Sequence, residues 1–148
     1  MPSGRRRQQP DQPRPVFFLD RGLGRRLIAE AIRARGFEAL PMAEAYPGGA
    51  DQRIADPDWM LRADQEGWVA LTKDFSLVRD HRDVLAESTL RVFAYNNANL
   101  TGPEMVHRLE TNFHRILQRA AKPGPFVYVI GRDRLELRWS PISDPRLR

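Results

Sequence analysis

The chain has 148 residues, enough for one domain with a real apolar core, and it lacks cysteine, which excludes disulfides and thiolate metal sites. A formal net charge of +5 and a pI near 10.4 favour an anionic partner, nucleic acid first among them. No apolar run approaches the roughly 20 residues of a membrane helix, and the N-terminal stretch lacks the apolar core of a secretory signal. We therefore expect a cytoplasmic protein with no membrane partner.

Residues 1–15 are rich in arginine, proline and glutamine and cannot form a packed element. We expect a disordered basic leader there, in which Arg5, Arg6 and Arg7 are solvated unless they touch phosphate. The sequence predicts a single folded domain over 16–140 and a frayed tail over 141–148.

Four short apolar runs predict the strands of a mostly parallel sheet, because helix-length segments separate them. These runs cover 16–19, 37–42, 68–72 and 90–95. A helix opening at Gly22 and Gly24 follows the first run, and Gly36 ends it.

A long surface loop is expected over 43–56. The next helix is predicted to take Asp56 as its N-cap and Pro57 as its first residue, and to stop at Gly67.

The second half of the chain predicts two more helices and a hairpin. A short helix or an irregular helical turn is expected over 75–87, and a long helix over 102–121 opens with a capping box of Thr101 and Glu104. The segments 126–130 and 135–139 flank a polar turn and predict a β-hairpin. The fold class is therefore α/β, a three-layer α/β/α sandwich with a mostly parallel sheet and a C-terminal β-hairpin.

Three aspartates stand out by position. Asp20 and Asp74 follow predicted strands, whose carboxyl ends meet at one edge of a parallel sheet, and Asp58 lies in the first turn of the helix between them. Crowded carboxylates repel one another, and a hard cation such as Mg²⁺ or Mn²⁺ relieves that repulsion. Such an ion polarises a phosphodiester and activates water. The aspartates therefore predict phosphodiester hydrolysis at a Mg²⁺ or Mn²⁺ site, although Asp58 could instead only complement the helix dipole.

Cationic side chains flank the predicted acidic site. Lys73, Arg21 and Arg79 are candidates for holding the phosphates of a nucleic acid, and solvated surface charge is the alternative for each. Thr72 and Ser76 are candidate accessory residues beside Asp74. The two histidines of the long helix, His107 and His114, are expected at the surface.

The segment 16–76 resembles the PIN-like nuclease domains of VapC-type toxins. The resemblance rests on FFLD ending in Asp20, on DPDWMLRADQEGW with Asp58 before Arg62 and Ala63, and on WVALTKDFS, in which Thr72-Lys73-Asp74 matches the family's Thr-x-Asp. Later pieces, RVFAYNNANLT and PFVYVI, resemble the C-terminal half of the shorter PIN-like toxins. The resemblance covers most of the chain after residue 15.

This resemblance implies a PIN-like, metal-dependent endoribonuclease that is the toxin of a toxin–antitoxin pair. Its implied partners are an RNA substrate, a cognate protein antitoxin and, through helices, a second copy in a homodimer. Two features depart from the family pattern. First, Ser76 stands where family members often have a further acidic residue. Second, larger PIN domains have an additional acidic residue between the first two aspartates, and none of the possible residues here matches a motif; they are Glu30, Glu38, Glu44 and Asp51. The alternative function is a catalytically degenerate PIN-like scaffold that binds RNA or a protein.

Two other families that place an aspartate after a strand fit less well. A haloacid-dehalogenase-like phosphatase needs a second aspartate two positions after the first, where this chain has Gly22. A receiver domain needs its threonine and lysine on separate strands, whereas Thr72 and Lys73 are adjacent here.

Overall fold

A six-stranded sheet organises the computed structural model of the chain, which describes residues 14–74 and 76–147. The elements in chain order are β1 (Val16–Leu19), η1 (Arg21–Leu23), α1 (Leu27–Ala34), β2 (Glu38–Pro41), α2 (Met42–Ala45), η2 (Ala50–Arg53), α3 (Asp56–Glu66), β3 (Val69–Thr72), α4 (Leu77–Ala86), β4 (Arg91–Tyr95), α5 (Gly102–Ala120), β5 (Phe126–Ile130), β6 (Leu135–Trp139) and η3 (Pro145–Leu147). None of the helices in this described part is long and apolar enough to cross a membrane.

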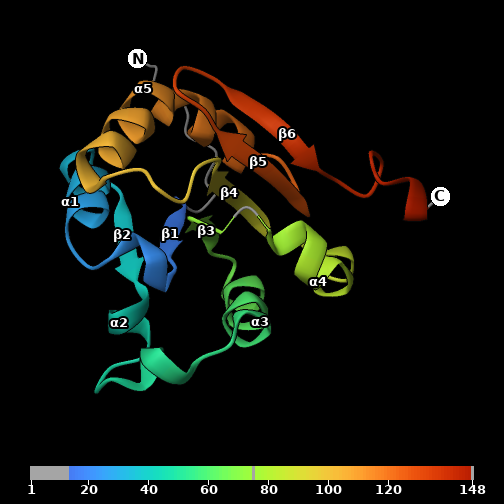
Figure 1. The fold of residues 1–148 in the computed structure, drawn as a ribbon, viewed down its shortest axis with the longest axis horizontal. Coiled ribbons are helices and arrows are strands. Elements are labelled where there is room, and N and C mark those ends of the chain that lie inside the picture. Colours follow the sequence, from blue (N-terminus) through green and yellow to red (C-terminus); the bar gives the residue numbers. More distant parts are fainter. Residues whose placement is uncertain (1–13, 75, 148) are drawn as a thin grey trace, which may run out of the picture.

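The strand order is β2-β1-β3-β4-β5-β6, and the prediction of a mostly parallel sheet is confirmed (Figure 1). The first five strands in this order are parallel to one another, and β6 alone runs antiparallel, as the second strand of the predicted C-terminal hairpin. Leu19 at the end of β1 pairs with Leu71 near the end of β3. The residues that follow these two strands therefore leave the sheet side by side.

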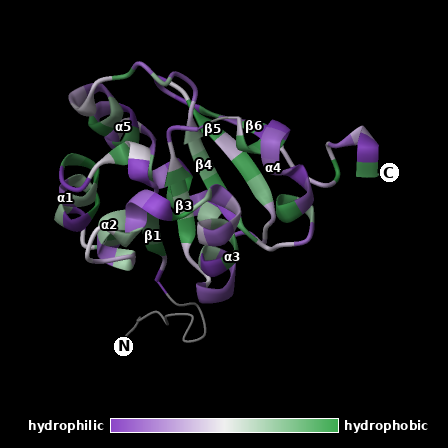
Figure 2. Ribbon diagram, turned by 60° about the horizontal axis from the view of Figure 1, so that its bottom comes forward, coloured by the Kyte–Doolittle hydropathy of each residue, from purple (hydrophilic) through white to green (hydrophobic). Residues whose placement is uncertain are grey.

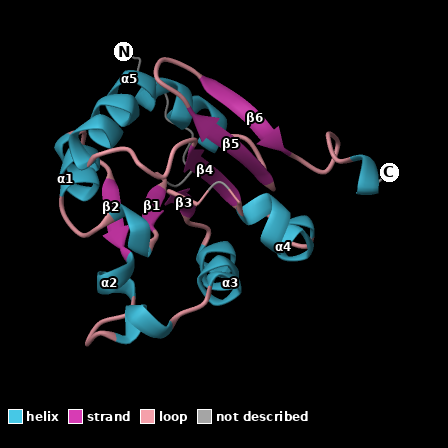
Figure 3. Cartoon of the chain, in the orientation of Figure 1, coloured by secondary structure: helices cyan, strands magenta, loops and turns pink. Residues whose placement is uncertain are grey.

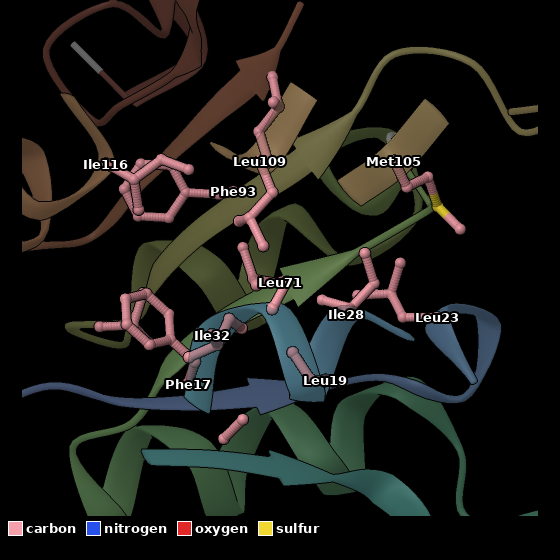
Figure 4. Close-up of a cluster of buried hydrophobic side chains, with 14 of the residues drawn as sticks. Phe17, Leu19, Leu23, Ile28, Ile32, Leu71, Phe93, Met105, Leu109 and Ile116 are labelled. Atoms are coloured by element: carbon pink, nitrogen blue, oxygen red, sulfur yellow. The ribbon is translucent and has the colours of Figure 1, made fainter. Parts of the chain in front are cut away.

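Helices cover both faces of the sheet, which confirms the three-layer α/β/α sandwich (Figure 3). Successive residues of a strand point to opposite faces. Phe17 and Leu19 accordingly pack with side chains of α1 and α5, as Figure 4 shows, whereas Phe18 packs near Trp59 of α3 on the other side. The central strands are mostly apolar, while the outer faces of the helices are polar (Figure 2). Burial of these two clusters is the main source of stability.

Most helix boundaries lie where the sequence predicts them. Gly36 and Gly67 end α1 and α3 with positive φ values of 85° and 74°, and the capping box of Thr101 and Glu104 opens α5. The first helix starts later than expected, because η1 and Gly24, at φ 73°, intervene before α1.

The segment 43–56 is more ordered than the predicted loop. It contains the end of α2 and all of η2, and the guanidinium of Arg21 donates to the backbone carbonyls of Asp51 and Ile54. One long side chain thus satisfies two carbonyls that would otherwise need water. The next helix begins one residue early: Asp56 is its first residue, and Ala55 occupies the N-cap without a side-chain hydrogen bond.

The segment after β6, expected to fray, is attached to the domain through Asp144. This carboxylate is 3% exposed; its Oδ2 accepts a hydrogen bond of 2.7 Å from Trp139 Nε1 and pairs with Arg82 of α4. The sequence offered no pattern for a contact 62 positions apart. The predicted basic leader lies outside the described residues except for its last two, 14 and 15.

We expect Asp144→Asn to lower the thermal midpoint at neutral pH. The Trp139 indole N–H, with smaller contributions from Arg146 N–H and Arg82, lowers the pKa of Asp144 to about 2. A carboxylate with a depressed pKa stabilises the fold above its unfolded pKa of about 3.9, and that contribution is lost as pH falls through the folded pKa. Thermal unfolding from pH 7 to pH 2 should therefore show the two midpoints converging below about pH 4. A constant difference down to pH 2 would contradict this role.

Candidate active site

An open cleft of about 740 Å³ lies where β1 and β3 end. Three carboxylates line it, from Asp20, Asp56 and Asp74, together with the three predicted cations Arg21, Lys73 and Arg79. The remaining lining residues are Gly22, Met42, Trp59, Ser76 and Ala98. The carboxyl ends of neighbouring parallel strands are where α/β folds place ligands, and this cleft follows that rule.

Asp20 is the buried member of the acidic set, with 8% of its surface exposed. Its Oδ1 accepts a hydrogen bond of 2.7 Å from Gly22 N–H, and its Oδ2 accepts one from the Thr72 hydroxyl. Burial raises the pKa of Asp20, the two hydrogen bonds offset part of that rise, and repulsion from Asp56 and Asp74 adds to it. The protein therefore holds a carboxylate in a place that disfavours its charge.

Thr72 connects Asp20 to Asp74. Its hydroxyl donates to Asp20 and accepts a hydrogen bond of 2.9 Å from Asp74 N–H. The Thr-x-Asp spacing thus has a direct structural reason: one hydroxyl fixes a carboxylate at the end of β1 and the backbone of the loop after β3.

Ser76 then orients the Asp74 carboxylate. Its N–H donates to Asp74 Oδ1 over 2.9 Å, and its hydroxyl donates to the same oxygen. Asp74 Oδ2 accepts no hydrogen bond from the described residues, so this oxygen is available to a ligand in the cleft.

The third aspartate of the cleft is Asp56, two positions before the predicted Asp58. Asp56 Oδ1 accepts a hydrogen bond of 2.9 Å from Trp59 Nε1, and its Oδ2 lies 3.5 Å from His81 Nε2. Asp58 is exposed and does not line the cleft. Residues three apart share a helix face, so Asp56 lies on the face of buried Trp59, while Asp58 points about 200° away. The three-residue spacing between Asp56 and Trp59 could have identified Asp56 as a cleft residue from the sequence. The assignment of Asp56 as an N-cap hid this possibility.

The three cations are engaged to different degrees. Arg21 uses its Nε and Nη2 on the carbonyls of Asp51 and Ile54, which leaves Nη1. Arg79 pairs with Asp80 at 2.8 Å. The Lys73 side chain makes no hydrogen bond or ion pair with the described residues, so its ammonium is the most available of the three for a ligand.

The comparisons with known proteins bear directly on this site. Residues 15–97, more than half of the chain, match the family described as "PIN like domain". The chain belongs to the PIN-like domain family. It is also 27% identical over 116 residues to the Mycobacterium tuberculosis (strain ATCC 25618 / H37Rv) protein named "Putative ribonuclease VapC45", an alignment that covers 77% of this chain and 84% of the relative. No solved structure matches.

The matched PIN-like region contains all three cleft aspartates and the segment 43–56. Of the four candidates for an additional acid, Glu30, Glu38 and Glu44 are exposed. Asp51 is 4% exposed, and its Oδ1 has no hydrogen-bond partner among the described residues. Asp51 does not line the cleft, but Arg21 holds its backbone beside the end of β1.

The donor set of this PIN-like cleft fits a hard divalent cation. Asp20 and Asp74 present carboxylate oxygens, and Asp56 adds a third. Burial, with a smaller contribution from Asp56 and Asp74, raises the pKa of Asp20, and a bound cation would favour its charged form. Among residues 14–74 and 76–147, no three acidic or histidine side chains already stand close enough to ligate one ion together. Binding would therefore draw the carboxylates closer to one another.

Thr72→Val tests the linking hydroxyl of the PIN-like domain. Valine keeps the shape but leaves the buried Asp20 carboxylate and Asp74 N–H without their shared partner. A hydrogen bond to a charged group contributes about 1.5–3 kcal/mol, so chemical denaturation at pH 7 should show a loss of that order. Thr72→Ser retains the hydroxyl and is the control; an equal loss in both variants would mean that side-chain packing, not the hydrogen bonds, is responsible.

Proposed function

We propose that this chain is a metal-dependent endoribonuclease, the toxin of a toxin–antitoxin pair, which cleaves RNA phosphodiesters in the cleft of Asp20, Asp56 and Asp74. The observation that carries the proposal is the grouping of one buried and two accessible aspartates at the shared end of β1 and β3. Membership of the PIN-like family and similarity to a relative named as a ribonuclease support the reaction class.

The three aspartates would hold Mg²⁺ or Mn²⁺, which supplies Lewis-acid polarisation of the phosphodiester and a lowered pKa for bound water. The chain's own groups then have distinct tasks. Thr72 and Gly22 hold the Asp20 carboxylate in place, and Ser76 fixes Asp74 with one oxygen toward the cleft. Trp59 and His81 position Asp56.

The cations of the cleft rim bind the RNA backbone on either side of the scissile bond. Lys73 offers a full ammonium, Arg21 offers its Nη1, and Arg79 extends from the start of α4. Phosphate contacts of this kind are independent of base sequence and weaken as salt rises.

The proposed antitoxin blocks the same cleft. An arginine inserted between the aspartates would pair bidentately with a carboxylate and replace the cation. A homodimer through helices remains a prediction from the family resemblance.

Induction of the isolated chain in a bacterial host tests the function as a whole. We expect growth arrest, relief on co-expression of a cognate antitoxin, and no arrest with Asp74→Asn as the matched inactive control. Arrest that persists with Asp74→Asn would contradict the nuclease. Absence of arrest together with RNA binding would favour the alternative, a degenerate scaffold.

A further inference from the structure

A second cleft, of about 260 Å³, lies beside the acidic one. Residues of α4, of the end of β6 and of the segment that follows β6 line it. The lining residues are Val78, Arg79, Arg82, Arg138, Trp139, Ser143, Asp144 and Pro145. The volume is several times the roughly 30 Å³ that a water molecule occupies in the liquid, so there is room for a phosphate group.

Three guanidinium groups line this basic cleft, from Arg79, Arg82 and Arg138, against a single carboxylate. That carboxylate, Asp144, already accepts hydrogen bonds from Trp139 Nε1 and Arg146 N–H and pairs with Arg82. It therefore anchors the segment 140–147, while Arg79 pairs at the surface with Asp80, which does not line the cleft.

Arg82 also carries a donor that the protein does not use. Its side chain is 21% exposed, and its Nε is buried without a hydrogen-bond partner in the described part of the chain. Buried donors are nearly always paired, so this N–H of Arg82 is an unmet donor beside the two further arginines of the cleft.

Arg79 lines both the acidic cleft and the basic cleft. The two clefts thus adjoin at the first turn of α4, directly after Asp74 and Ser76. A ligand that reaches both must present negative charge at regular intervals, and the backbone of single-stranded RNA does so.

We propose that the basic cleft of Arg79, Arg82 and Arg138 binds a backbone phosphate of the RNA, outside the acidic cleft that holds the scissile bond. The inference rests on the proposed function for its ligand. The anchored segment 140–147 then has a purpose: it brings Ser143 to the cleft and forms the wall opposite α4.

Arg138→Glu tests the phosphate site, with Arg119→Glu as its matched control. Both arginines are exposed and both changes alter net charge equally, but Arg119 lies on α5, in the opposite helical layer, over the ring of Tyr128. Binding is measured on full chains carrying Asp74→Asn, with a single-stranded RNA of about ten nucleotides, so that cleavage does not intervene.

We expect Arg138→Glu to weaken RNA binding about tenfold more than Arg119→Glu does at low salt. The slope of log affinity against log salt should become shallower by about 0.7 if the basic cleft binds one phosphate. The effect should be smaller for a dinucleotide than for the longer RNA. Arg138→Gln should be intermediate between wild type and Arg138→Glu, and thermal unfolding confirms that each variant is folded.

Equal affinities for Arg138→Glu and Arg119→Glu would overturn the phosphate site, even if the wild-type chain cleaves RNA. The phosphate site would also be overturned if Arg138→Glu weakened binding of the antitoxin but not of RNA, because the cleft would then be a protein interface. If the wild type binds RNA in an Arg138-dependent way but cleaves none, the phosphate site stands and the nuclease proposal fails.

Discussion

Asp20→Asn is expected to reduce RNA cleavage by more than about 100-fold, because changes to residues that merely support metal ligands already cost roughly 10- to 100-fold. Asparagine keeps the size of the side chain and can still accept a hydrogen bond from Gly22 or Thr72. The decrease should therefore come from the missing negative charge. Cleavage of total RNA by purified chains measures it.

The same substitution is expected to stabilise the metal-free fold at neutral pH. Burial raises the pKa of Asp20, so the folded state holds its proton more tightly than the unfolded state does. Stability from this group is fully present below its unfolded pKa of about 3.9 and is lost as pH rises through the folded pKa. Asp20→Asn removes that penalty, and its advantage over wild type should vanish below about pH 4.

Asp74→Asn serves as the comparison for Asp20→Asn. It should lose cleavage to a similar extent, and its thermal midpoint shows whether the fold is retained. An Asp20→Asn chain that cleaves like wild type would remove Asp20 from the site. A destabilised variant would show that its charge is needed for folding.

Asp56→Asn and Asp58→Asn form the second test, and they are expected to differ sharply. Asp56 lines the cleft, and asparagine can still accept the hydrogen bond from Trp59 Nε1, so the fold should survive while cleavage falls at least about tenfold. Asp58 is exposed in the first turn of α3. Its replacement should leave cleavage intact and cost only about a few tenths of a kcal/mol from the helix dipole.

The opposite result would be equally clear. If Asp58→Asn removes cleavage while Asp56→Asn retains it, the ion binds on the other side of α3, and the grouping of aspartates in the cleft is not the active site. Thermal midpoints of both variants, measured with EDTA, separate loss of activity from loss of fold.

The sheet could be predicted because each strand is specified by a short apolar run in the sequence. The apolar runs at 16–19 and 68–72 fix two buried strands, and consecutive helices between strands require parallel pairing. The meeting of Asp20 and Asp74 at one edge follows from the general rule for ligand sites in such sheets.

The sequence was least informative where side chains act over long distances or where the face of a helix decides which residue lines the cleft. Asp56 shares a helix face with buried Trp59, three positions on, whereas Asp58 points away from it, so Asp56 rather than Asp58 lines the cleft. The anchoring of the C-terminal segment depends on Asp144 meeting Arg82, and no spacing rule connects positions that far apart. Local patterns specify elements, whereas these contacts depend on how the elements are assembled.

The most direct measurement is cleavage of total RNA by the purified wild-type chain with Mg²⁺, with Mn²⁺ and with EDTA, beside the variants at Asp20, Asp56, Asp58 and Asp74. We predict cleavage with either ion, none with EDTA, and loss in the Asp20, Asp56 and Asp74 variants but not in Asp58→Asn. Cleavage that continues in EDTA, or that persists in Asp20→Asn or Asp74→Asn, would contradict the assignment of this cleft as a metal-dependent nuclease site.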